Sequence, residues 1–139
     1  DLPQCSAANV SVAIAPDDGL FSATIYAADT KSPAEISATT AELADKAQNG
    51  KLTKEDISGG SFTVSNLGMY GITQFTAIVN PPMGAILALG KATQKVVIDD
   101  GEQRIATVLN ATLSCDHRVI DGAVGAQYLA ALSEVIGSL

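Results

Sequence analysis

The 139-residue sequence contains no tryptophan, a single histidine and two cysteines, and aromatic residues make up only 4% of it. So few aromatic side chains argue against base-stacking surfaces and aromatic ligand cages. Lysine and arginine together number 8 against 15 aspartates and glutamates, which gives a formal net charge of -7, and the basic residues do not cluster. Nucleic acids and anionic membranes are therefore not expected as partners.

The scarcity of histidine and cysteine also disfavours a metal site and a disulfide framework. One histidine and two distant cysteines, Cys5 and Cys115, lack the spacing of metal ligands, and we expect both thiols to be reduced. No run of 18 apolar residues could span a membrane, and no secretory or arginine-rich transit segment opens the chain. The expected compartment is the cytosol or, after processing, the mitochondrion.

Apolar residues make up 47% of the chain, and its length suits one domain. Residues 9–15 and 20–26 are strand-like and flank a turn at 16–19, which predicts a β-hairpin. Ser32 with Pro33 and Glu35 predicts the start of a helix that ends at Gly50.

The second half of the chain is dominated by predicted strands. Residues 61–65 and 75–79 are strand-like, 84–98 and 105–115 predict two long strands joined by a turn at 99–102, and 123–136 predicts a helix. This order indicates an α+β fold, with helices on one face of a mixed or antiparallel sheet.

His117 is the first candidate for chemistry. It lies between a long strand and a helix, flanked by Asp116 and Arg118 and followed by Asp121. A carboxylate near an imidazole can fix its tautomer and tune its basicity. The alternative is a hydrogen-bonded structural histidine, and residue type alone leaves both open.

Ser65 is the second candidate, at the end of a strand beside a glycine-containing corner at 66–71. Its hydroxyl could donate a hydrogen bond to an oxyanion, or it could simply cap the turn. A nucleophilic role is disfavoured because no Gly-x-Ser-x-Gly elbow surrounds it. The nearby glycines do not form a phosphate loop, since no helix follows them.

Three segments resemble one known family. Residues 113–129 are similar to the Asp-His-Arg-x-x-Asp-Gly signature of the 2-oxo-acid dehydrogenase acyltransferases. Residues 59–71 resemble the serine region of that family, and 75–82 followed by 85–90 resemble its connecting strands. The three segments occur in the family's order. Around Ser65 and His117 the sequence looks most like the pyruvate dehydrogenase complex branch.

The resemblance implies a chloramphenicol acetyltransferase-like α+β sandwich, with residues 1–139 as a single partial catalytic domain that lacks the N-terminal part of the family domain. No lipoyl or peripheral-subunit-binding domain is included. It further implies homotrimers, possibly within a larger core, whose active sites lie between subunits, with one subunit bringing His117 and its neighbour Ser65. Other pyruvate dehydrogenase complex subunits would be partners, in the mitochondrial matrix or the bacterial cytoplasm.

The resemblance also implies a mechanism. An acetyl group would pass between coenzyme A and a lipoyl thiol supplied by a separate domain, without a metal. His117 would act as the base that deprotonates the thiol, Ser65 as the oxyanion donor, and Asp121 as a residue that holds the geometry beside the histidine. Asp116 and Arg118 would brace the loop.

Two other functions remain as alternatives. A noncatalytic core component similar to protein X would organise the complex without transferring acetyl, although it would have no chemical need for His117 and Ser65. A small-molecule acetyltransferase of the chloramphenicol type would share the histidine chemistry but not the 59–71 segment.

Overall fold

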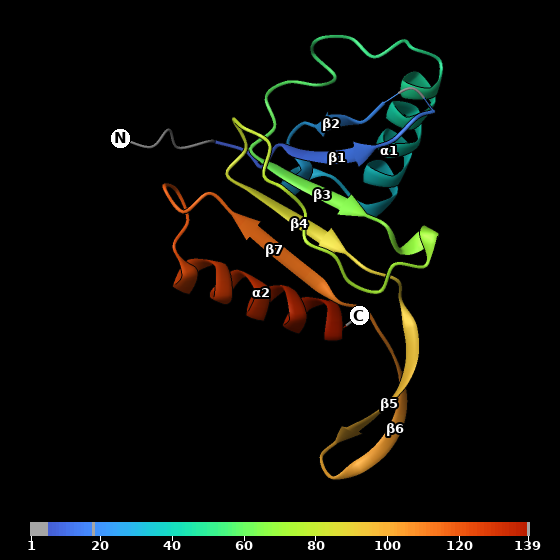
Figure 1. Cartoon of the computed structure of the whole chain (residues 1–139), viewed down its shortest axis with the longest axis vertical. Coiled ribbons are helices and arrows are strands. Elements are labelled where there is room, and N and C mark those ends of the chain that lie inside the picture. Colours follow the sequence, from blue (N-terminus) through green and yellow to red (C-terminus); the bar gives the residue numbers. More distant parts are fainter. Residues whose placement is uncertain (1–5, 18, 139) are drawn as a thin grey trace.

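The computed structural model describes residues 6–17 and 19–138, which form a five-stranded mixed sheet, a two-stranded ribbon and two α-helices (Figure 1). The α+β prediction is confirmed. The elements in chain order are β1 (Val10–Ile14), β2 (Phe21–Ile25), η1 (Ala28–Thr30), α1 (Pro33–Gln48), β3 (Phe62–Asn66), η2 (Gly68–Tyr70), β4 (Ala85–Leu89), β5 (Thr93–Asp99), β6 (Glu102–Val108), β7 (Ala111–Cys115) and α2 (Gly122–Gly137).

The main sheet has the strand order β2-β1-β3-β4-β7. β1 pairs with β2 in antiparallel fashion, as the predicted hairpin requires. β3 lies parallel to both β1 and β4, and β7 closes the sheet antiparallel to β4. The sheet is therefore mixed, and β2 and β7 are its two edges.

Helix α1 begins where the local sequence predicts. The Ser32 hydroxyl accepts a hydrogen bond from the Glu35 amide at 3.3 Å, and the Ser32 amide donates to the Glu35 carboxylate at 2.8 Å. This reciprocal capping box gives hydrogen-bond acceptors to two backbone N–H groups at the helix start, those of Ser32 and Glu35, that have no partner within the helix. Pro33 occupies the first helical position, where its missing N–H costs nothing.

Both helices cover the same face of the sheet. The register aligns Ala23, Val12, Val64, Leu87 and Leu113 in one row across all five strands. Helix α1 packs on one end of this face, where Leu43 joins the core formed with Ala23 and Ile25. Helix α2 packs on the other end, where a Cβ at Gly125 would lie 3.6 Å from the side chain of Leu113. The predicted arrangement of helices on one face is confirmed.

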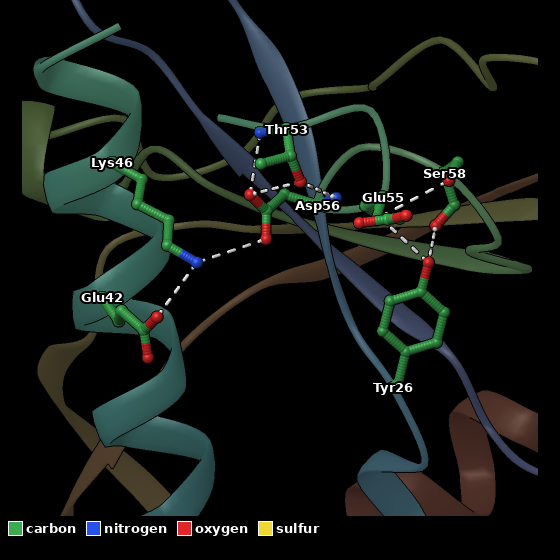
Figure 2. A network of polar contacts seen from close by, with 7 residues as sticks. All are labelled: Tyr26, Glu42, Lys46, Thr53, Glu55, Asp56 and Ser58. Atoms are coloured by element: carbon green, nitrogen blue, oxygen red, sulfur yellow. Dashed lines mark hydrogen bonds and ion pairs between the residues drawn. The ribbon is translucent and has the colours of Figure 1, made fainter. Parts of the chain in front are cut away.

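A polar network fastens the segment between α1 and β3 to its neighbours (Figure 2). Lys46 of α1 pairs with Asp56 at 3.4 Å, and Asp56 in turn accepts from the amide and hydroxyl of Thr53. The hydroxyl of Tyr26, the residue that follows β2, contacts the carbonyls of Glu55 and Ser58, each at 2.9 Å. These contacts hold the segment between α1 and β3 against β2, the edge strand of the sheet.

Three predicted strands differ from the structure. The predicted strand at 84–98 is divided into β4 and β5, and that at 105–115 into β6 and β7. The break lies at Gly90, whose amide donates to the Asn110 carbonyl at 2.9 Å while the Thr73 carbonyl occupies the place of a Cβ. Residues 75–79 form no strand. Ile78 there is 90% exposed, so its side chain does not contribute to the core of the described chain.

Within the described chain, neither α-helix is long and apolar enough to cross a bilayer. Cys115 forms no disulfide with any described residue, and burial raises the pKa of its thiol. Cys5 lies outside the described residues.

Candidate active site

The loop that carries His117 is a tight turn between β7 and α2, organised by the backbone of Asp116. The Asp116 amide donates to the Gly84 carbonyl at 2.9 Å, which continues the pairing of β7 with β4 by one step. The Asp116 carbonyl accepts from the amides of Val119 at 2.9 Å and Ile120 at 3.0 Å. The backbone on both sides of His117 is therefore held in place.

The side chain of Asp116 adds a second set of bonds to this turn. Its carboxylate accepts from the Arg118 amide at 3.0 Å and from the Arg118 guanidinium at 2.7 Å and 3.0 Å. The hydrogen bonds from the guanidinium, followed by that from the amide, lower the pKa of Asp116 to about 2. The predicted pair that braces the loop is present, with the carboxylate side chain only 20% exposed.

Asp121 ends the loop and begins α2. Its Oδ1 accepts from the Val124 amide at 2.9 Å, so the side chain is the N-cap of the helix. The helix start and the end of the histidine loop are thus fixed by the same residue. The role that the resemblance implies for Asp121, holding the geometry beside the histidine, stays a prediction.

His117 itself is exposed at the first position of the turn. Among residues 6–17 and 19–138, none forms a hydrogen bond with its imidazole. The alternative of a hydrogen-bonded structural histidine therefore gains no support from the described chain. An exposed imidazole on a well-held backbone can instead accept a proton from a bound molecule.

Ser65 lies in β3 and is half-buried. The turn-capping role that was its alternative is performed by its neighbour Asn66, whose Oδ1 accepts from the Gly68 amide at 2.8 Å. Sequence reasoning missed Asn66, although an asparagine two residues before a glycine is a common turn signal. The Ser65 hydroxyl forms no hydrogen bond within the described part of the chain.

The structure does not bring Ser65 and His117 together within one chain. Ser65 pairs with Ala88, and Ala88 pairs with Thr112 at the start of β7, whereas His117 follows the end of β7. Cys115, the last residue of β7, lies two strands away from Ser65 and three residues further along the sheet. At about 4.8 Å per strand and 3.3 Å per residue, the distance between Ser65 and Cys115 is roughly 14 Å. The expectation that one subunit supplies the two as neighbours is wrong, because they lie at opposite ends of the sheet.

Comparison with known proteins places this fold and this loop in a family. The family described as 2-oxoacid dehydrogenases acyltransferase (catalytic domain) matches residues 3–139. A curated relative, the dihydrolipoyllysine-residue acetyltransferase component of the pyruvate dehydrogenase complex of Rickettsia felis, is 45% identical over 130 residues. The match covers 94% of this chain but 32% of that protein, so the chain spans about a third of its relative's length.

Solved structures agree with the sequence match. The structure of the Azotobacter vinelandii dihydrolipoamide acetyltransferase superposes with a TM-score of 0.93 at 38% identity, covering 97% of this chain and 56% of that one. The cubic core of the pyruvate dehydrogenase multienzyme complex gives the same TM-score, identity and coverage.

The Azotobacter work concerned the role of a serine, a histidine and an asparagine in the catalytic mechanism of that enzyme. The serine precedes the histidine there by 52 positions and the asparagine follows it by 4, the same separations as those of Ser65, His117 and Asp121 here. The histidine loop, the mixed sheet with two helices on one face, and the match over residues 3–139 lead to one conclusion. This chain belongs to the 2-oxoacid dehydrogenase acyltransferase family, to its catalytic domain.

Proposed function

We propose that residues 1–139 form part of a catalytic domain that transfers an acetyl group between coenzyme A and a lipoyl thiol in the pyruvate dehydrogenase complex. The observation that carries the proposal is the exposed imidazole of His117 on a rigid turn, at the spacing from Ser65 and Asp121 found in the Azotobacter enzyme. The lipoyl group would come from a separate domain. Other subunits of the complex are the proposed partners.

In this mechanism His117 removes the proton from the attacking thiol, and the thiolate attacks the carbonyl carbon of the acetyl thioester. The tetrahedral intermediate then expels the other thiolate, which takes the proton back from the imidazolium. A positioned base contributes about 10²–10⁴-fold to such a step. Ser65 would donate a hydrogen bond to the oxyanion, and Asp121 would hold the loop through its cap of α2.

The separation of Ser65 and His117 supports an active site between subunits. A base and an oxyanion donor must both lie within roughly 3–3.5 Å of the reacting groups, far less than the distance between the two ends of the sheet. We therefore propose a homotrimer in which His117 of one subunit meets Ser65 of the next.

The β5–β6 ribbon is consistent with such association. It extends away from the main sheet (Figure 1). Val96 pairs with Ile105 on one of its faces, and these side chains are 66% and 70% exposed. Ile98, on the same face, is 75% exposed. Contiguous exposed apolar surface of this kind is typical of protein–protein contacts.

The relatives include bacterial and mitochondrial proteins. We accordingly propose the bacterial cytoplasm or the mitochondrial matrix as the compartment.

Acetyl transfer from acetyl-CoA to free dihydrolipoamide tests the function. The purified chain should transfer acetyl, and His117→Ala should lower kcat by about 10²-fold or more while circular dichroism stays unchanged. Equal background rates for the two proteins would contradict the proposal and favour the noncatalytic, protein X-like role. Asn66→Ala is a useful control, because it alters the neighbouring turn without removing either proposed catalytic group.

A further inference from the structure

A small recess lies where the β5–β6 ribbon leaves the main sheet. Its volume is about 40 Å³, and its polar lining comes from Thr73, Lys91, Thr93, Lys95 and Asn110. A water molecule needs roughly 10–15 Å³ of such space, so the recess can hold a few small atoms but not a ring system. Its size therefore suits a single compact polar group.

The walls of this recess are held by hydrogen bonds that join three segments of the chain. The Lys91 amide donates to the Ile72 carbonyl at 2.7 Å, and the Asn110 side chain donates to the Thr73 carbonyl at 3.1 Å. Gly90 allows the closest approach, since the Thr73 carbonyl lies where any Cβ would be. The backbone that surrounds the recess is consequently fixed by the fold.

The residues that line the recess carry positive charge, whereas the chain as a whole is negative. The net charge of the sequence is -7, yet two of its 8 basic residues border this one recess, and no aspartate or glutamate is among the lining residues. Three of the other basic side chains are already paired: Lys46, Arg104 and Arg118 each lie within 3.4 Å of a carboxylate. Lys91 and Lys95 form no such pair with a described residue. Two ammonium groups that border one recess, together with hydroxyl and amide donors, favour an anion with several oxygens.

The recess lies at the Ser65 end of the sheet. Ser65 pairs with Ala88 of β4, and Lys91 follows Ala88 by three residues, a distance of at most about 10 Å along an extended chain. Of the two thiol substrates proposed above, the lipoyl group carries no phosphate, whereas coenzyme A carries a pyrophosphate and a phosphate monoester at the far end of its pantetheine arm. A cationic recess near the thioester site can therefore distinguish coenzyme A from the lipoyl group.

We propose that Lys91 and Lys95 form a phosphate-binding subsite for coenzyme A beside Ser65 of the same subunit. This inference rests on the proposed acetyl transfer. The two lysines bind the phosphate charge and do not take part in the chemical step. They lower KM for the coenzyme without changing kcat.

The test is the double variant Lys91→Gln/Lys95→Gln of the whole chain, beside Lys51→Gln/Lys54→Gln. The control removes the same charge from exposed residues between α1 and β3. We expect KM for acetyl-CoA to rise about tenfold or more in the first variant, since two charge-assisted hydrogen bonds are lost, with kcat and KM for dihydrolipoamide unchanged. The control should retain the wild-type values. An equal KM in all three proteins would overturn the subsite.

Direct binding separates this inference from the proposed function. Calorimetry with coenzyme A requires no turnover, so weakened binding in the Lys91/Lys95 variant supports the subsite even if the chain transfers no acetyl. A wild-type chain that binds no coenzyme A at millimolar concentration contradicts it. The same measurement with dephospho-coenzyme A, which lacks the phosphate monoester, identifies the group that is bound. If the Lys91/Lys95 variant loses equal affinity for both coenzymes, the recess binds the pyrophosphate. If it loses affinity for coenzyme A alone, the recess binds the monoester.

Discussion

The intersubunit site can be tested by mixing two inactive variants, His117→Ala and Ser65→Ala. Each should be inactive alone, by about 10²–10⁴-fold for the base and about 10²–10³-fold for the oxyanion donor. Because roughly 14 Å separates Ser65 from the end of β7 within a chain, no single subunit can use its own pair. Mixed trimers, in contrast, contain intact pairs at some of their interfaces.

The size of the recovery follows from symmetry. In a cyclic trimer that contains both variants, about one site in three combines an intact histidine with an intact serine. Random mixing at equal concentrations then restores roughly a quarter of the wild-type activity, far above either parent. The assay is dihydrolipoamide acetylation after the variants have been dissociated and reassembled together.

Two controls make the result decisive. Differently tagged subunits, recovered through one tag, show that exchange has occurred. The double variant His117→Ala/Ser65→Ala mixed with His117→Ala contains no intact pair at any interface and should remain inactive. If verified mixed trimers of the single variants are no more active than their parents, the argument from strand register is refuted.

Three further predictions concern the framework of the site. Gly90→Ala should lower the free energy of unfolding by about 1–3 kcal/mol, measured by urea titration, because the new methyl group meets a backbone carbonyl. Gly122→Ala, where a Cβ meets nothing within 4 Å, should not lower it. Asp121→Ala should cost about 1 kcal/mol through loss of the α2 cap, whereas Asp121→Asn should cost little; equal losses would contradict the capping role. Finally, Asp116 has a folded pKa of about 2, below its usual 3.8, so its contribution to stability is present above the unfolded value and is lost as the pH falls toward 2. Asp116→Asn should flatten this part of the acid-unfolding profile, and an unchanged slope would contradict the role of its pair with Arg118.

Local chemistry explains which elements could be predicted. The start of α1 depends on Ser32, Pro33 and Glu35, which lie within four consecutive positions, and Ser32 and Glu35 hydrogen-bond to each other in the structure. The β1–β2 hairpin follows from alternation and an intervening turn. The length and polarity of the 116–121 loop likewise place His117 between a strand and a helix without any knowledge of the sheet order.

Non-local contacts decided the rest. The division of the long predicted strands occurs at Gly90, because the carbonyl of the distant Thr73 approaches it. The pattern of apolar residues along the chain cannot predict this contact between distant residues. The recess bordered by Lys91 and Lys95 likewise depends on distant residues, because Thr73 and Asn110 also line it.

The sequence by itself determined the family, the candidate residues and the local elements, since these depend on motifs and on neighbours along the chain. Only the tertiary structure decided that Ser65 and His117 lie apart. Because β3 pairs in parallel with β4 and β4 pairs in antiparallel fashion with β7, the C-terminal ends of β3 and β7 lie at opposite ends of the sheet. Strand direction is a property of the assembled sheet, and no spacing between two residues in a sequence can specify it.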